Sequence, residues 1–220
     1  MSRFVALPTI TDDSALGGST IERSLRFNGS DTYIQRTSSG GNRRTWTVSF
    51  WAKFCDSSAT TNQRFWSCDG NSGNYDMLKI EFYGGTDSSR QIAIIDQGHA
   101  GNGIRFTLKR KFRDSSAWYH FVFAQDSTQS TASERMKIYV NGVRETEFLD
   151  NSTHNHPPDQ NYQGNVNATG KTNTWGRSFS FGSGSGDYLD GYLANINFID
   201  GAQLDPVSYT HLRAHETRLN

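Results

Sequence analysis

Apolar and polar residues alternate with a period of two along several parts of the chain. In an extended strand, neighbouring side chains point to opposite faces, so this period predicts strands that bury one face. The apolar positions are Trp46, Val48, Phe50, Ala52 and Phe54 in the first such segment, Leu78, Ile80 and Phe82 in the second, and Ile104, Phe106 and Leu108 in the third. These segments predict three half-buried strands.

A different pattern occupies residues 118–124, which are almost all apolar at both parities. This is typical of a central strand that is covered on both faces. His120 lies within this run, and we expect it to be a buried structural histidine rather than a base.

Turn-forming residues separate the predicted strands. Asn28-Gly29-Ser30-Asp31 interrupts an alternating segment at 24–34, and Asn141-Gly142 follows another at 136–140. Both have the residue chemistry of hairpin turns, and Asn-Gly readily supplies the positive φ angles of a type I′ turn. We therefore predict a hairpin at each position.

The last predicted strand spans about 192–199, with Tyr192, Ala194, Ile196 and Phe198 expected on one face. No segment has a sustained helical period with caps, and the polar stretch 151–173 predicts a long surface loop. About ten short strands without crossover helices predict an all-β fold with two antiparallel sheets packed as a sandwich.

Composition and charge narrow the classes of partner. Aromatic residues make up 13% of the chain, which favours a packed aromatic core over disorder. The 22 basic and 22 acidic residues cancel, so we expect no nucleic-acid partner. Neither a signal peptide nor a membrane-length apolar stretch is evident, which predicts no membrane insertion. Cys55 and Cys68 are then expected as two buried free thiols ahead of a disulfide across a hairpin, and the sequence leaves that bridge open.

The chain divides into three predicted parts. Residues 1–22 form a leader segment, residues 23–206 one domain, and residues 207–220 a tail. The tail resembles the translation of an adapter used to prepare DNA sequencing libraries, so it is set aside from fold reasoning. We therefore expect a metagenomic fragment whose natural chain continues beyond residue 206.

Four segments in a fixed order resemble a known family. Residues 24–27, 45–53, 117–120 and 137–142 are similar to laminin-G-like jelly-roll domains of the concanavalin A-like lectin/glucanase superfamily. Further motifs at 41–46, 126–135 and 189–201 resemble a subset found in bacteriophage virion structural proteins. The resemblance covers about residues 23–205 and implies a concanavalin A-like sandwich.

Glucanases of the same superfamily carry paired carboxylates on one strand, in a Glu-x-Asp-x-(x)-Glu pattern. This pattern does not occur in the chain. Glu81 is a lone acid on its strand, Glu145 and Glu147 lie beside a hairpin turn, and we expect all three on solvated strand faces. The sequence therefore predicts that the protein is not an enzyme.

The resemblance also implies that the protein could bind sugars or calcium. Aromatic faces stack on pyranose rings in such folds, although most aromatic residues of a sandwich belong to its core. The glycan-binding candidates beside turn-rich segments are Trp66, Tyr75, Tyr83, Trp175 and Tyr188. Calcium is the metal ion that the family suggests, and its candidate ligands, unless they only cap turns, are Asp69, Asp76, Asp187 and Asp190.

The resemblance implies a non-catalytic structural or adhesive module of a phage particle, such as a tail appendage or capsid decoration. Its expected partners are other virion proteins or host-surface glycans, and its expected location is the virion, after synthesis in the host cytoplasm. One alternative is a carbohydrate- or protein-binding domain of a bacterial surface protein. Another is a polysaccharide hydrolase on the same fold, and the sequence leaves the ligand and the oligomer state open.

Overall fold

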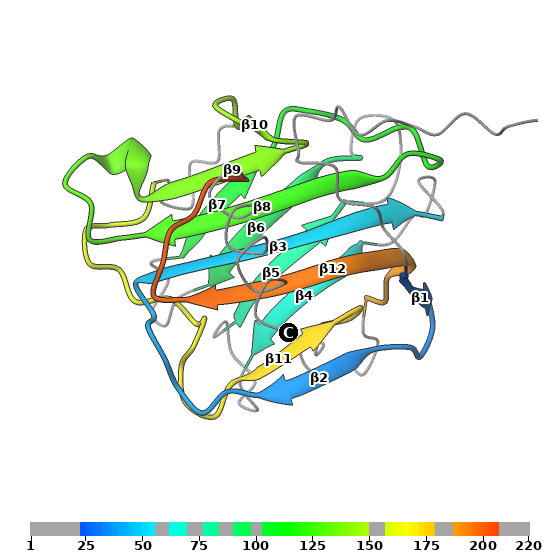
Figure 1. Cartoon of the computed structure of the whole chain (residues 1–220), viewed down its shortest axis with the longest axis horizontal. Helices are drawn as coiled ribbons and strands as arrows, with labels where there is room; N and C mark the ends of the chain where they lie inside the picture. The colour runs from blue at the N-terminus through cyan, green and yellow to red at the C-terminus, as the bar shows by residue number, and fades with distance from the viewer. Residues whose placement is uncertain are drawn as a thin grey trace, which may run out of the picture.

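The computed structural model describes residues 23–55, 62–69, 77–83, 90–97, 103–149, 157–178 and 187–206, without the side chains of Asp69 and Gln97. These residues form two antiparallel sheets of six strands each, packed face to face (Figure 1). The all-β sandwich predicted from the alternating pattern is confirmed. The predicted leader and tail lie outside the described residues.

In spatial order, sheet A contains β1 (Leu25–Asn28), β12 (Asp190–Asp200), β3 (Thr45–Phe54), β8 (Tyr119–Asp126), β9 (Met136–Val140) and β10 (Val143–Arg144). Sheet B contains β2 (Ile34–Thr37), β11 (Thr172–Trp175), β4 (Gln63–Asp69), β5 (Met77–Phe82), β6 (Ile92–Gln97) and β7 (Ile104–Thr107). A short 3₁₀ helix, η2 (Ala132–Glu134), precedes β9. No helix among the described residues is long and apolar enough to cross a membrane.

Aromatic side chains from both sheets fill the space between them. The Phe50 ring of β3 lies 5.6 Å from Phe65 of β4 and 5.6 Å from Phe121 of β8, centroid to centroid. Rings of Phe54 and Phe82 are 4.6 Å apart across the same interface. The alternation of β3, β5 and β7 therefore points the predicted apolar side chains inward, where their burial drives the packing of the sheets.

Strand β8 is covered on both faces, as its continuous apolar sequence predicts. Phe121 and Phe123 belong to the core between the sheets, and Val122 and Ala124, on the opposite face, are also fully buried. The residues after β12 cross this outer face of sheet A, running over β3 and β8 toward β9 (Figure 1).

Hydrogen bonds attach this crossing segment to sheet A. The Thr47 hydroxyl donates to the carbonyl of Ala202 at 2.7 Å, and the backbone N–H of Leu204 donates to Thr47 Oγ1 at 2.9 Å. Gln203 Nε2 donates to the carbonyl of Ala124 at 3.3 Å. Thr47, whose side chain points to the outer face of sheet A, is thereby buried.

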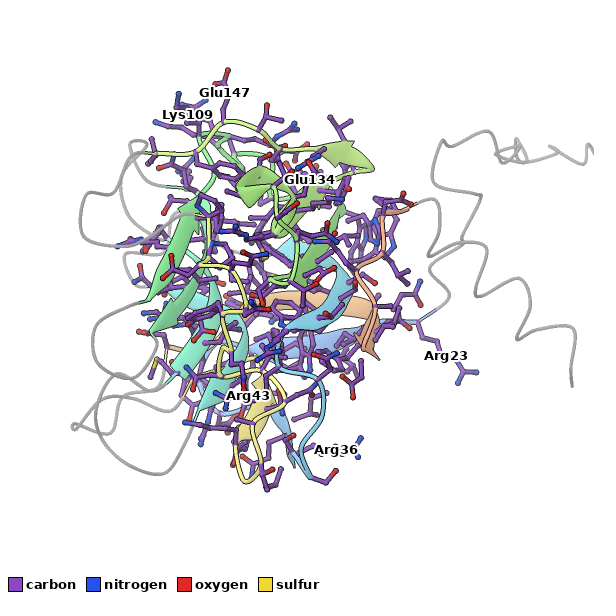
Figure 2. The ribbon with its side chains drawn as sticks, turned by 90° about the vertical axis from the view of Figure 1, so that its left-hand side faces the viewer. Arg23, Arg36, Arg43, Lys109, Glu134 and Glu147 are labelled. Carbon is purple, nitrogen blue, oxygen red and sulfur yellow. The ribbon has the colours of Figure 1, made fainter. Side chains whose placement is uncertain are left out.

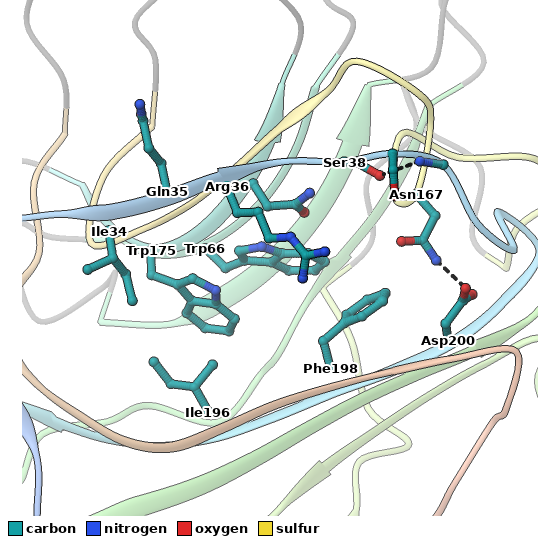
Figure 3. Close-up of a pocket in the computed structure, with 13 residues that line it drawn as sticks. Ile34, Gln35, Arg36, Ser38, Trp66, Asn167, Trp175, Ile196, Phe198 and Asp200 are labelled. Atoms are coloured by element: carbon teal, nitrogen blue, oxygen red, sulfur yellow. Dashed lines mark hydrogen bonds between the residues drawn. The ribbon is translucent and has the colours of Figure 1, made fainter.

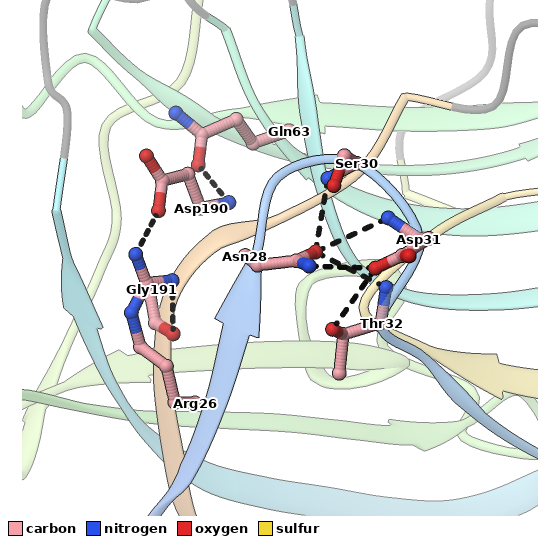
Figure 4. Close-up of polar contacts among 8 residues, drawn as sticks. All are labelled: Arg26, Asn28, Ser30, Asp31, Thr32, Gln63, Asp190 and Gly191. Atoms are coloured by element: carbon pink, nitrogen blue, oxygen red, sulfur yellow. Dashed lines mark hydrogen bonds and ion pairs between the residues drawn. The ribbon is translucent and has the colours of Figure 1, made fainter.

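The first predicted hairpin is wrong, because the strands on either side of Asn28–Asp31 lie in different sheets. β1 pairs with β12, and β2 pairs with β11. Asn28 Oδ1 accepts the backbone N–H groups of Ser30, Asp31 and Thr32 at 3.1, 3.1 and 3.2 Å (Figure 4). The turn chemistry is real, but it carries the chain from one sheet to the other.

The second predicted hairpin is confirmed. β9 and β10 pair around Asn141 and Gly142, whose φ angles are 49° and 80°. These left-handed values are those a type I′ turn requires.

The prediction of one face for residues 192–198 is also wrong. A β-bulge between Ala194 and Asn197 shifts the pairing of β12 with β3. Tyr192 and Ala194 share the outer parity of Trp51 and Lys53, whereas Phe198 pairs with the inward-facing Val48. Because one extra residue reverses the alternation, the second half of β12 turns its apolar side chains into the sandwich.

Cys55 and Cys68 form no disulfide with each other, and the expectation that both thiols are buried is wrong for Cys55. Cys55 is exposed just after β3, whereas Cys68 is buried on β4 in the other sheet. The Cys68 thiol donates to the carbonyl of Asn165 at 3.1 Å. It therefore acts as a small core residue that also contacts the loop before β11.

Candidate cleft between the sheet edges

A cleft of about 570 Å³ opens where an edge of sheet B faces an edge of sheet A. β2 and β11 form its wall on sheet B, and the second half of β12 forms its wall on sheet A (Figure 3). β1 pairs only with residues 190–193 of β12, so the next residues of β12 have no strand beside them on that edge. This volume is within the usual range of small-molecule sites.

Two indole rings form the aromatic wall of the cleft. Trp66 of β4 and Trp175 of β11 stack with centroids 5.7 Å apart and planes 19° from parallel. Trp66 is only 2% exposed and makes an edge contact with Trp46 of the core at 6.2 Å, whereas Trp175 is partly exposed. Trp66 therefore supports Trp175, which presents more of its ring to a ligand.

Strand register explains why the two tryptophans meet. Trp66 and Trp175 are direct cross-strand partners in the pairing of β4 with β11. A register shift between Arg64 and Trp66 in the pairing with β5 lets the consecutive residues Phe65 and Trp66 both reach the core. A regular strand would have placed one of them on the outer face.

Phe198 closes the aromatic wall from the opposite sheet. Its ring lies 6.0 Å from that of Trp66 and remains 40% exposed. Ile34 and Ile196 line the same end of the cleft as Trp175 (Figure 3). This end offers mainly apolar and aromatic surface.

The other end of the cleft carries hydrogen-bonding groups. Asp200 Oδ1 accepts the backbone N–H of Asn42 at 2.9 Å and Asn167 Nδ2 at 2.8 Å. The Asn167 amide also donates to the carbonyl of Asn42 at 3.1 Å, which holds the loop before β11 against the one before β3. The Asp200 carboxylate is thereby fixed at the polar end (Figure 3).

Arg36 of β2 lines the middle of the cleft, on the inward parity that it shares with Ile34. It pairs with Asn173 of β11, which also lines the cleft. Within the part of the chain that the structure describes, Arg36 makes no ion pair or side-chain hydrogen bond. Its donors are available to a ligand.

The predicted glycan-binding aromatics do not all lie at one site in the structure. Trp66 and Trp175 meet in the cleft, whereas Tyr83 receives a hydrogen bond from Arg105, whose guanidinium lies over its ring. Tyr188 accepts a hydrogen bond from Arg177 at 3.4 Å. Tyr75 lies outside the described residues. Of the four described members of the set, the two tryptophans line the cleft.

Glu81 does not lie on a solvated strand face, which corrects that expectation. It is 1% exposed and forms ion pairs with Arg64 and Lys79 on the outer side of sheet B. Burial, reinforced by the charge of Arg64, lowers the pKa of Lys79 to about 8. Asp187 pairs with Arg64 at 2.7 Å and so belongs to the same charged network.

The two calcium candidates whose side chains are described both contact arginines. Asp187 pairs with Arg64, and Asp190 lies 2.6 Å from a guanidinium nitrogen of Arg26 (Figure 4). Among the described residues, no three acidic, histidine or cysteine side chains gather as a metal site. The Asp69 side chain and Asp76 fall outside the description, so calcium binding by this set stays a prediction.

Sequence reasoning missed Arg36, Phe198 and Asp200 as lining residues. No pattern in the sequence singled out Arg36, which lies beyond the predicted hairpin at 24–34, and the uninterrupted period in β12 hid the bulge. The Asn195 backbone has φ = 46°, and asparagine tolerates this left-handed conformation well. No clear signal of the bulge is present in the sequence, because Asn195 and Asn197 both occupy the alternate positions where a regular half-buried strand also carries polar residues.

The sequence of residues 28–205 matches the family described as the concanavalin A-like lectin/glucanases superfamily. The chain belongs to this superfamily. The laminin-G-like resemblance noted in the sequence is thereby confirmed, and solved laminin domains share the fold. No curated protein matches the chain in sequence.

Solved structures show how widely this superfamily fold is used. Domain 4 of a GH43 extracellular arabinanase from Geobacillus stearothermophilus, in complex with arabinotriose, has a TM-score of 0.57 and 15% identity over 88% of this chain and 78% of its own. Mouse laminin alpha1 domains LG4-5 give 0.52 and 10%, over 82% of this chain and 42% of theirs.

A tailspike has the same fold. Full-length tailspike protein 2 from the Escherichia coli O157:H7 bacteriophage CAB120 has a TM-score of 0.56 and 14% identity, over 86% of this chain and 24% of its own. The superfamily domain thus spans about a quarter of the tailspike and less than half of the laminin chain. At these identities the likeness establishes the fold alone.

Proposed function

We propose that the domain binds carbohydrate in the cleft and does not cleave it. The observation that carries this proposal is the stacked Trp66–Trp175 pair beside the fixed carboxylate of Asp200 and amide of Asn167. An aromatic face can pack against the apolar face of a sugar ring, while carboxylate and amide groups hydrogen-bond its hydroxyls. The cleft offers both kinds of contact.

The relatives support a carbohydrate ligand. The family name covers lectins and glucanases, and the arabinanase domain was solved with arabinotriose. The bound arabinotriose and the family description support saccharide recognition as a use of this fold. The chemistry of the cleft is then the local reason for placing the ligand there.

The single acidic side chain among the described lining residues favours binding over hydrolysis. Glycosidases generally use two carboxyl groups on either side of the scissile bond. Among the described lining residues Asp200 is the only acid, and two N–H donors already hold its Oδ1. These described lining residues include no second carboxyl group for acid–base chemistry.

Replacing Trp175 by alanine tests the proposal. We expect the W175A variant to lose about tenfold or more of its affinity for saccharides that bind the native protein, because it removes the partly exposed stacking face. A glycan array would identify the ligands, and isothermal titration calorimetry would then compare the two proteins.

Trp118→Ala is the matched control, because Trp118 is also partly exposed but contacts Tyr192 on the outer side of sheet A. We expect W118A to bind saccharides with the same affinity as the native protein. We also expect no reducing sugar to accumulate when either protein is incubated with these saccharides. Equal affinity of W175A and the native protein for every saccharide would contradict the proposed site, and sugar release would contradict a purely binding role.

For the wider role, we propose an adhesive module of a phage particle, which would use the cleft on host-surface glycans. The shared fold of the tailspike and the phage-type sequence motifs support this proposal. Recovery of the surrounding genome sequence tests it: neighbouring tail or capsid genes are expected. Metabolic neighbours would overturn the virion role without affecting carbohydrate binding.

A further inference from the structure

The cleft holds one cationic and one anionic side chain among its described lining residues. Arg36 projects from β2, and Asp200 lies at the end of β12 on the opposite sheet. No ion pair joins them, although both line the same cavity. Their separation leaves room for a ligand that contacts each of them.

Asp200 is held away from Arg36 by its own hydrogen bonds. Its Oδ1 accepts N–H groups from Asn42 and Asn167, which belong to loops at the polar end of the cleft. Figure 3 shows the Arg36 side chain near the middle of the cleft, above Trp66, and Asp200 beyond Phe198. The aspartate is therefore suited to hold sugar hydroxyls rather than to neutralise the arginine.

Arg36 is a charged residue on the face of β2 that lines the cleft. It lies on the same face of β2 as Ile34, and both residues line the cleft while remaining exposed. Figure 2 shows Arg36 at the lower edge of the molecule. A guanidinium presents five N–H donors in a planar fork, and an oxyanion can accept two of them in parallel. Because Arg36 is exposed, this fork is accessible to such a ligand.

We infer that the saccharide bound by this cleft carries an anionic group, and that Arg36 binds it. The inference rests on the proposed carbohydrate-binding function of the same cleft. The shared chemistry is an oxyanion on a sugar ring, either the carboxylate of a uronic acid or a sulfate ester. Trp175 stacks on a ring of this ligand, and Asp200 accepts hydroxyl groups at the far end.

Matched saccharides separate this inference from general carbohydrate binding. Oligogalacturonate, alginate and hyaluronan oligosaccharides would each be titrated beside their carboxyl-reduced forms, which keep linkage and stereochemistry but lose the charge. Dextran sulfate beside dextran supplies the sulfate case. We expect at least one acidic member to bind about tenfold or more tightly than its neutral partner, as a charge-assisted hydrogen bond allows.

Three variants locate the source of that preference. R36Q is expected to bind the acidic and neutral members of a pair equally, and R36K to keep part of the preference because it keeps the charge but loses the fork. R113Q removes an exposed arginine that does not line the cleft, so it is expected to keep the native preference. Circular dichroism would show that each variant is folded.

The outcomes are distinct. Neutral members that bind as tightly as acidic ones, or an acidic preference that persists in R36Q, would overturn the inference and leave carbohydrate binding intact. A preference lost equally in R36Q and R113Q would show attraction to overall charge and would also overturn it. If no saccharide of either kind bound, the proposed function itself would be wrong, and this inference with it.

Discussion

His120 shows how a single side chain can occupy a strand face without serving catalysis. It lies on the outer side of sheet A, is 6% exposed, and its ring is 5.0 Å from that of Trp51. Its backbone N–H donates to Asn141 Oδ1 at 2.8 Å. Burial lowers the pKa of the imidazole to about 4, so the side chain is neutral near pH 7. The expectation of a buried histidine is confirmed.

This pKa predicts a dependence of stability on pH. The unfolded chain protonates His120 near pH 6.5, whereas the folded protein resists protonation until about pH 4, so the unfolded state binds the proton first as the pH falls. We expect the free energy of unfolding to decrease by about 2 kcal/mol between pH 7 and pH 5 from this group. Urea denaturation at several pH values measures it.

His120→Gln provides the comparison, because it removes the titrating group and keeps a polar side chain. The difference in unfolding free energy between the native protein and H120Q is expected to change over this pH range. A difference that stays constant from pH 7 to pH 5 would contradict the lowered pKa.

Strand β12 is the element on which the cleft depends. The even-numbered residues in the first half of the strand lie on the outer face of sheet A, whereas those in the second half point into the sandwich. The bulge at Asn195 and Ile196 causes this change. Asn195 adopts φ = 46°, and its carbonyl accepts Asn197 Nδ2 at 2.6 Å. The bulge thereby brings Phe198 and Asp200 to the cleft instead of the outer face.

Substitution of Asn195 tests this account of the element. Asn195→Gly is expected to leave stability nearly unchanged, because glycine accepts a left-handed backbone. Asn195→Val is expected to lower the free energy of unfolding by about 1–2 kcal/mol, because a β-branched side chain clashes in that conformation. Thermal denaturation of the two variants would compare them, and equal stability would argue against the left-handed bulge.

At the scale of the whole molecule, the residues after β12 add a partial third layer on sheet A. Thr47 accepts the N–H of Leu204 and donates to the carbonyl of Ala202, contacts between residues more than 150 positions apart in sequence. These bonds satisfy the hydroxyl of Thr47, a polar residue that is buried on the outer face of β3. They also connect the last described segment to the centre of the sheet.

Loss of the Thr47 hydroxyl should loosen this layer. Thr47→Val keeps the shape of the side chain but leaves the Leu204 N–H and the Ala202 carbonyl without this partner, so we expect a loss of about 1–3 kcal/mol in unfolding free energy. Thr47→Ser keeps the hydroxyl and is expected to lose less. Hydrogen exchange of the Leu204 amide would report the same order, and equal exchange in all three proteins would contradict it.

Local sequence determined which segments are strands and which faces of most strands are apolar. A period of two is a property of the extended backbone itself, so Trp46, Phe50 and Ile80 could be placed inside before any partner strand was known. The type I′ turn at Asn141-Gly142 is local for the same reason. Trp66 and Trp175 could also be selected as candidates, but not as neighbours.

Only the tertiary structure decided which strands pair and where the cleft forms. Asn28–Asp31 has hairpin chemistry in either arrangement, and the pairing of β1 with β12 depends on residues far away in sequence. The bulge in β12 and the meeting of Arg36, Trp175 and Asp200 likewise arise from the register between strands. Register is fixed by burying the largest apolar surface across the whole sandwich, a global quantity that no single segment encodes.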